Sequence, residues 1–200
     1  MKTLSRFFLA GIISIVASSV FAQSPNAVVE EAAAILEKEL AERKEEVTND
    51  KDALYAMIDA ILLPRFDKRY AEALVLGSHW KTATDEQREA FIDAFYKSLR
   101  NKYADGILKF DQSSIKVQPF RGDDTKKRAV VKTVVTLGDG KEVFVNYGVV
   151  HRQAGWLIFD VTIEGISYIV NFRAEMNSEI QNTSLDAVIA RLQSEVGGAA

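Results

Sequence analysis

The chain has 200 residues, of which 48% are hydrophobic and 26% charged, and its formal net charge is −3 at pH 7. That length supplies the core of one ordinary domain, and the apolar content excludes wholesale disorder. The mild acidity argues against nucleic-acid binding, and the absence of cysteine excludes disulfides, thiol nucleophiles and iron–sulfur clusters. The two histidines, His79 and His151, show no metal-ligand spacing, so we expect neither a metal nor a cofactor.

The first 22 residues have the organisation of a signal peptide. Lys2 and Arg6 form a positive start, residues 7–16 form a short apolar segment, and Val20-Phe21-Ala22 offers a cleavage site. The segment falls short of the roughly 20 apolar residues that span a bilayer, although an uncleaved anchor remains the alternative. We therefore expect residues 1–22 to be removed. Residues 23–200 then form one exported domain with 23 basic and 28 acidic residues, a net charge of −5.

The first half of the remaining chain has helical periodicity. Apolar residues recur every three or four positions between 29 and 40 and again between 54 and 61, which predicts two helices. Pro64 ends the second helix, and a third covers about residues 66–76 before Gly77. Thr84 and Gln87 form a capping box, so a long helix is expected to begin there and to run through Tyr103.

From residue 115 the period changes to two, which is typical of strands. The segments 115–120, 128–137, 142–151 and 156–163 are rich in Val, Ile, Phe and Tyr. Turns are predicted at Gly138-Asp139-Gly140 and at Gln153-Ala154-Gly155. Two helices are expected to follow, with Ser167 and Ser184 as N-caps. This order of elements indicates an α+β domain with an antiparallel sheet.

No catalytic motif stands out. Gly138–Lys141 reads GDGK, but the spacing of a phosphate-binding loop is absent and a turn is the better interpretation. At strand spacing Asp160 and Glu164 would share a face with Trp156 and Ile158, as paired carboxylates do in some isomerases. The alternative is that Asp160 lies at a rim and Glu164 begins a turn. Asp123-Asp124 and residues 126–128 are most simply a solvated loop.

Large apolar residues are more numerous than one helix–sheet layer obviously requires. They could fill a solid core, or they could enclose an apolar pocket. Periodicity together with fold suggests these lipid-lining candidates: Leu74, Phe95, Tyr103, Val134, Phe144, Tyr147, Ile158 and Ile166. Headgroup contact at the mouth of such a pocket would require polar partners. The candidates for that role are Arg65, Lys68, Arg69 and Lys102.

Several co-linear segments resemble the MlaC family, also called the toluene-tolerance family. They include Ala73-Leu74-Val75-Leu76-Gly77 with Trp80, then Ala83-Thr84 with Gln87-Arg88, and Phe91 with Phe95. Farther on, Trp156, Phe159-Asp160-Val161 and Glu164-Gly165-Ile166-Ser167 resemble the last strand of the family and its exit into a helix. The resemblance covers roughly residues 54–192.

The resemblance implies an NTF2-like fold, in which a curved antiparallel sheet and helices surround a deep apolar cavity. It implies a periplasmic, non-catalytic phospholipid carrier. The implied partners are phospholipid, an inner-membrane MCE-domain transporter complex and an outer-membrane lipoprotein–porin complex; we expect a monomer and no nucleic acid.

Three other functions remain open on the residues alone. One is an enzyme of the same fold that uses Asp160 or Glu164 on a hydrophobic substrate. The second is a periplasmic chaperone for lipidated proteins. The third is a structural adaptor with a solid core.

Overall fold

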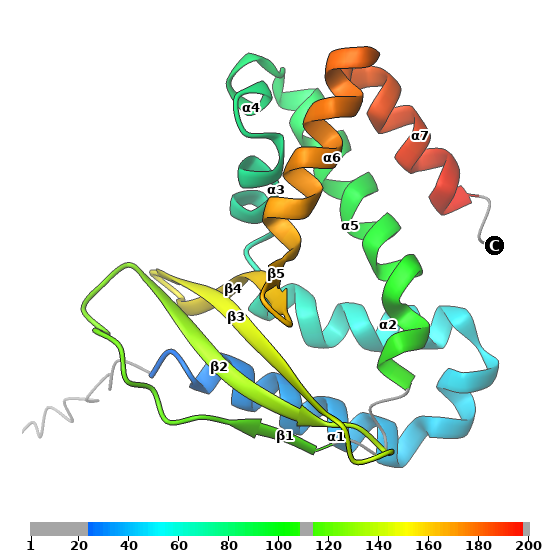
Figure 1. Cartoon of the computed structure of the whole chain (residues 1–200). Coiled ribbons are helices and arrows are strands. Elements are labelled where there is room, and N and C mark those ends of the chain that lie inside the picture. The colour runs from blue at the N-terminus through cyan, green and yellow to red at the C-terminus, as the bar shows by residue number, and fades with distance from the viewer. Residues whose placement is uncertain (1–23, 109–113, 198–200) are drawn as a thin grey trace, which may run out of the picture.

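Both ends of the described chain are helical, and the strands lie between them (Figure 1). The computed structural model describes residues 24–108 and 114–197, so the predicted signal peptide lies outside the described residues. Before the sheet come α1 (Ala27–Asn49), α2 (Lys51–Leu62), the 3-10 helix η1 (Leu63–Arg65), α3 (Lys68–Leu76), α4 (His79–Thr82) and α5 (Asp85–Ile107). After it come α6 (Tyr168–Asn182) and α7 (Leu185–Gly197).

The helix boundaries follow the capping residues. Thr84 and Gln87 form the predicted capping box at the start of α5, with each side chain accepting a hydrogen bond from the other residue's backbone N–H. The Asp50 carboxylate accepts hydrogen bonds from two N–H groups at the start of α2. Gly77 ends α3 with a φ of 56°, a conformation that favours glycine. These short-range signals explain why the helix predictions are confirmed.

The sheet has five antiparallel strands in the order β1-β2-β3-β4-β5. They are β1 (Ser114–Val117), β2 (Arg128–Thr136), β3 (Glu142–Arg152), β4 (Gly155–Ile163) and β5 (Ile166–Ser167). The four predicted strands and both predicted turns are confirmed, and the fold class is α+β as expected. The two-residue strand β5 was not predicted because so short a segment has no detectable periodicity.

The two faces of the sheet differ in what covers them. We call the side that carries Val131, Val149 and Ile158 the inner face. These three residues pack with Val28 and Val29 of α1. We call the opposite side the outer face. Because successive side chains of a strand point to opposite faces, the even-numbered residues of β2 lie on it: Arg128, Val130, Lys132, Val134 and Thr136. Helix α1 runs beneath the sheet in Figure 1, on the inner face.

A β-bulge changes the faces of β4. Val149 pairs with Ile158, whereas the preceding residue Gly148 pairs with Asp160, so Phe159 is an extra residue in β4. Asp160 therefore lies on the outer face and Ile158 on the inner face. The prediction that Asp160 shares a face with Trp156 and Ile158 is wrong, because strict alternation does not account for an inserted residue.

Buried apolar residues form three clusters. The largest joins α3, α5, α6 and α7, and in it Phe95 stacks on Phe91 and meets Phe172 edge to face, with ring centroids 5.2 Å apart in each pair. A second cluster joins α1, α2 and α5, and the third joins the start of α1 to the inner face of the sheet. Helices α3 and α6 contact β4, so the helical group stands beside that side of the sheet (Figure 1).

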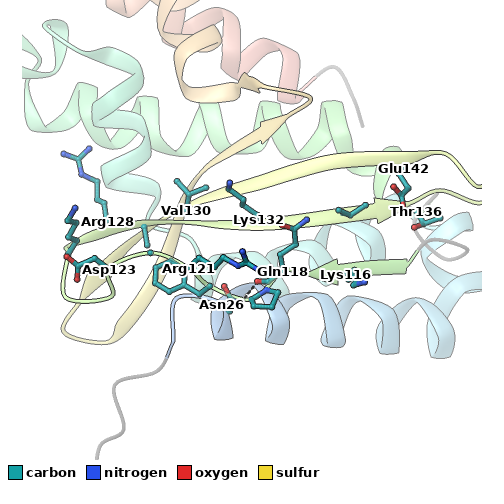
Figure 2. Close-up of a pocket in the computed structure, with 16 residues that line it drawn as sticks. Asn26, Lys116, Gln118, Arg121, Asp123, Arg128, Val130, Lys132, Thr136 and Glu142 are labelled. Atoms are coloured by element: carbon teal, nitrogen blue, oxygen red, sulfur yellow. Dashed lines mark hydrogen bonds between the residues drawn. The ribbon is translucent and has the colours of Figure 1, made fainter.

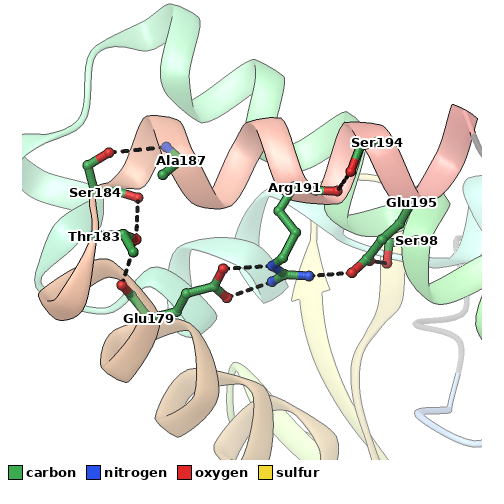
Figure 3. A network of polar contacts seen from close by, with 8 residues as sticks. All are labelled: Ser98, Glu179, Thr183, Ser184, Ala187, Arg191, Ser194 and Glu195. Carbon is green, nitrogen blue, oxygen red and sulfur yellow. Dashed lines mark hydrogen bonds and ion pairs between the residues drawn. The ribbon is translucent and has the colours of Figure 1, made fainter.

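Helix α7 is attached to its neighbours by a polar network (Figure 3). The Arg191 guanidinium donates two hydrogen bonds to Glu179 of α6, at 2.6 and 2.7 Å, and a third to Glu195 at 2.6 Å. Ser98 of α5 donates to the other oxygen of Glu195 at 2.9 Å. A bidentate guanidinium–carboxylate pair constrains orientation as well as distance, so the network helps to hold α7 against α6 and α5.

Among the described helices, none combines the length and the apolar composition that crossing a membrane requires.

Candidate functional site

A large cleft lies on the outer face of the sheet, with a volume of about 970 Å³ (Figure 2). Its floor is the outer side of β1 and β2, and one wall is the segment 118–126. In Figure 2 the side chains of Arg128, Val130 and Lys132 point away from α1. The cleft is lined by Asn26, Lys116, Gln118, Pro119, Phe120, Arg121, Gly122, Asp123, Lys126, Arg128, Ala129, Val130, Lys132, Val134, Thr136 and Glu142.

This cleft is basic although the chain is acidic. Its lining contains five cationic residues and two carboxylates. The cationic residues are Lys116, Arg121, Lys126, Arg128 and Lys132, and the carboxylates are Asp123 and Glu142. Within the described residues none of the five cations forms an ion pair. The Asp123 carboxylate accepts two hydrogen bonds from Thr125, which lower its pKa and hold the turn. The cleft therefore presents an excess of unpaired positive charge.

The wall of the cleft is held by local contacts. The Asn26 side-chain amide, at the start of α1, donates a hydrogen bond to the Gln118 carbonyl at 2.9 Å. Phe120 packs over Gly122, where an added Cβ would lie 2.5 Å from the Phe120 ring. Asn26 is itself buried, so this attachment joins the wall to the body of the protein. The cleft is thus shaped by ordered backbone rather than by side chains alone.

The inner face is mainly apolar, with Thr133 as a buried polar residue on it. We call the part of this face that carries Val143, Val145, Val161 and Ile163 its far half. Val131 and Val149 are fully buried in the sheet–α1 cluster. In the far half, Val143, Val161 and Ile163 are partly buried, whereas their neighbours Val135 and Val145 are buried. Tyr147 lies between these two regions, and burial raises the pKa of its phenol to about 12. A phenol is neutral at physiological pH, and burial makes its ionisation still less favourable, so this half of the face carries no charge from Tyr147.

The eight predicted lipid-lining residues do not converge on one cavity. Tyr147 and Ile158 lie on the inner face. Val134 and Phe144 are cross-strand partners on the outer face, where Phe144 is 53% exposed. Because a sheet separates its two faces, these pairs cannot line the same pocket.

The other four candidates lie outside the sheet faces. Phe95 is a core residue of the helical cluster, and Leu74 is partly buried in α3. Tyr103 is on α5, with its ring 5.5 Å from that of Tyr168. Ile166 is 64% exposed in β5. Contact of any of the eight with lipid stays a prediction.

The headgroup candidates are spread over several elements. Arg65 donates to the Ile61 carbonyl at 3.0 Å, while its Nε is buried without a partner among the described residues. Arg69 pairs with Glu89. Lys68 and Lys102 lie over the rings of Tyr96 and Tyr103, at 4.8 and 5.8 Å from the ring centroids. They form no common site.

Asp160 and Glu164 both have structural partners. Asp160 accepts hydrogen bonds from the Ser167 hydroxyl at 2.7 Å and from the Ile169 N–H at 3.1 Å, so it helps to cap α6. Glu164 lies in a turn with a φ of 48° and accepts a hydrogen bond from the Phe144 N–H at 2.7 Å. The turn interpretation of Glu164 is therefore confirmed.

The two histidines are far from forming a metal site. The His79 ring is 3.0 Å from the Asn177 side-chain oxygen, and His151 packs edge to face against Trp156. In the part of the chain that the structure describes, no group of three His, Cys, Asp or Glu side chains could hold a metal ion.

The basic cleft was missed by the sequence analysis, which interpreted residues 123–128 as a solvated loop. A signal was present in the alternation of Arg128, Val130 and Lys132, together with Lys116 and Gln118. Strand period places each of these sets on one face. The pairing of β1 with β2 was needed to show that both sets share the same face.

Comparisons with known proteins agree with this fold. The profile of the MlaC protein family matches residues 30–194. A toluene tolerance protein, ttg2D, of Pseudomonas putida is 28% identical over 169 residues, which are 84% of this chain and 78% of that protein. The intermembrane phospholipid transport system binding protein MlaC of Haemophilus influenzae is 22% identical over 173 residues, covering 85% of this chain and 81% of that protein.

A solved structure shares the architecture. It is a phospholipid-binding protein from Ralstonia solanacearum, determined in complex with a phospholipid, with a TM-score of 0.82 and 20% identity. The alignment covers 88% of this chain and 99% of that one, and at this identity it shows the fold. Because the family profile spans well over half of the sequence, the chain belongs to the MlaC protein family.

Proposed function

We propose that this protein is a non-catalytic phospholipid carrier that holds acyl chains against the far half of the inner sheet face. The observation that carries the proposal is the family membership, in which a relative is named as a phospholipid transport binding protein. The related fold from Ralstonia solanacearum, solved with a phospholipid, also supports it.

The inner face supplies suitable surface for hydrocarbon. Val143, Val161 and Ile163 are aliphatic and only partly buried, and Tyr147 is neutral. Covering the water-exposed part of apolar side chains with hydrocarbon lowers the free energy. Acyl chains on this surface would complete a burial that the protein's own side chains leave unfinished.

The energetics of transfer favour a carrier without covalent chemistry. A lipid with about 30 methylenes would cost roughly 24 kcal/mol to expose to water, at ~0.8 kcal/mol per methylene. A carrier must replace bilayer hydrocarbon almost one for one, since far tighter binding would prevent release. Aliphatic lining provides such a balanced exchange, and headgroup selectivity is then expected to be weak.

The two carboxylates named for the enzyme alternative, Asp160 and Glu164, are already engaged. Asp160 helps to cap α6 and Glu164 bonds to the backbone of β3, so each has a structural role. We therefore favour a carrier over an enzyme of the same fold.

The family and the composition of residues 1–22 support a proposal for location and partners. We infer export to the periplasm by the signal peptide and exchange of phospholipid with an inner-membrane MCE-domain transporter complex and an outer-membrane lipoprotein–porin complex. ATP would be hydrolysed by the transporter.

Native mass spectrometry of protein purified from the periplasm tests the cargo. We expect a phospholipid adduct with mixed headgroups on a monomer. A spectrum without any lipid adduct would favour a structural adaptor, and an acylated polypeptide would favour a chaperone; either result contradicts the carrier.

A pair of substitutions tests which face holds the acyl chains. Ile163→Trp fills space on the inner face, and we expect it to lower the lipid recovered per protein severalfold while the fold persists. Val134→Trp is the same type of change on the outer face, at a residue that the sequence-based hypothesis lists for lipid contact. Loss of lipid in Val134→Trp alone would show that the chains lie on the outer face.

A further inference from the structure

Three of the five cations of the outer-face cleft, Lys116, Arg128 and Lys132, lie along its floor of β1 and β2. Arg128 and Lys132 alternate with Val130 and Val134 on β2, and Lys116 is the cross-strand partner of Val134. Successive side chains on one face of a strand are about 7 Å apart, so the nine residues of β2 extend over about 27 Å. The lining therefore offers positive charge and aliphatic surface in alternation along an elongated floor.

In the part of the chain that the structure describes, the carboxylates that line the cleft do not balance its cations. Five cations and two carboxylates leave an excess of three positive charges, on a chain whose net charge is −3. One of the carboxylates, Asp123, is already engaged by Thr125. An unpaired cationic cleft on an acidic protein attracts anionic partners to one place and one orientation.

The shape of the cleft distinguishes between kinds of anion. A volume of about 970 Å³ is far larger than a single phosphate group needs. A bilayer surface is flat and cannot follow a cleft whose wall is held by the Asn26–Gln118 hydrogen bond. An extended polypeptide segment fits both the length and the alternation, since its own side chains also repeat every two residues.

We propose that the outer-face cleft is a docking site for an acidic segment of a partner protein, in which carboxylates alternate with aliphatic side chains. Carboxylates of the segment pair with Arg128, Lys132 and Lys116, and its aliphatic side chains cover Val130, which is 53% exposed. The site lies on the opposite side of the sheet from the proposed acyl-chain surface. Docking can therefore occur whether or not lipid is bound, and the proposal does not depend on the identity of the cargo.

The test measures binding of a fluorescein-labelled twelve-residue peptide of alternating Glu and Val by fluorescence anisotropy, at 50 mM and 300 mM salt. The full chain is compared with Lys116→Glu/Lys132→Glu. A matched control, Lys38→Glu/Lys81→Glu, makes the same charge change at exposed lysines of α1 and α4. Thermal melting of each variant verifies that it is folded.

We expect the cleft variant to bind the peptide at least tenfold more weakly, and the control to remain within threefold of the unchanged chain. Raising the salt concentration should weaken binding to the unchanged chain most. The cleft variant should also gain affinity for the corresponding Lys–Val peptide. Equal affinity in the cleft variant and its control, or no binding by the unchanged chain, would overturn the proposal. Binding to phosphatidylglycerol vesicles but not to the peptide would overturn it in favour of a lipid surface.

Discussion

The two faces of strand β2 are built from adjacent residues but have opposite roles. Val131, Thr133 and Val135 are buried on the inner face, while Val130 and Lys132 are exposed on the outer face. The inner residues are apolar or internally hydrogen-bonded, and the outer ones alternate charge with aliphatic surface. A period of two thus lets one short sequence provide both a core and a charged cleft.

The strongest test of this contrast places the same charge on each face. Val131→Asp puts a carboxylate where the side chain is 0% exposed, without a cationic partner, and we expect a loss of more than about 4 kcal/mol in the free energy of unfolding. Val130→Asp, one residue earlier, should change it by less than about 0.5 kcal/mol. Urea denaturation measures both. Similar losses in the two variants would mean that the outer face is covered.

A buried carboxyl in the helical group extends the comparison. Burial raises the pKa of Glu72, in α3, to about 9. The positive charge of Lys68 lowers this pKa by a smaller amount, and the negative charges of Glu89 and Asp93 raise it further. The folded state then binds a proton that the unfolded state releases above about pH 4.5. The free energy of unfolding therefore falls as pH rises from about 4.5 to 9, by up to about 1.4 kcal/mol per pH unit.

Glu72→Gln should remove this dependence and stabilise the protein by up to about 3 kcal/mol at pH 7. The difference should be small at pH 5 and should stop growing above about pH 9. Glu175→Gln, an exposed change on α6, serves as the control and should have little effect. Denaturation midpoints between pH 5 and 9 measure the slope, and parallel curves for Glu72→Gln and the unchanged chain would contradict the buried protonated carboxyl.

The smallest expected effect concerns one hydroxyl on the inner face. Thr133 is buried and donates a hydrogen bond to the Val145 carbonyl at 2.7 Å. Thr133→Val keeps the shape but removes this bond, so we expect a loss of about 1 kcal/mol. Thr136→Val, on the outer face, should be nearly neutral. A neutral result for Thr133→Val would show that the hydroxyl adds nothing to the pairing of β2 with β3.

Prediction of the fold succeeded where the determining contacts are close in sequence. The Thr84–Gln87 capping box, the N-caps at Ser167 and Ser184 and the turn at Gly140 each involve residues within four positions of one another. Side-chain hydrogen bonds and glycine conformation act at that range, so the residue types alone indicate them.

Prediction of the site was weaker because it depends on which strand face a residue occupies. Val134 and Phe144 have the apolar character of pocket residues. They nevertheless share the outer face with three cations of the cleft floor, Lys116, Arg128 and Lys132. The bulge at Phe159 moved Asp160 to the opposite face from Ile158. Apolar composition identifies residues that can meet hydrocarbon, but it does not say on which side of the sheet they lie.

The sequence by itself determined the order of the longer helices and strands, the family and the absence of cysteine chemistry, because these depend on residue identity and local spacing. The tertiary structure alone decided that β1 lies beside β2, that a bulge reverses the faces of β4, and that cations from residues 116–132 gather in one cleft. The physical reason is that long-range strand pairing, unlike capping or turn formation, joins residues that no short sequence window contains together.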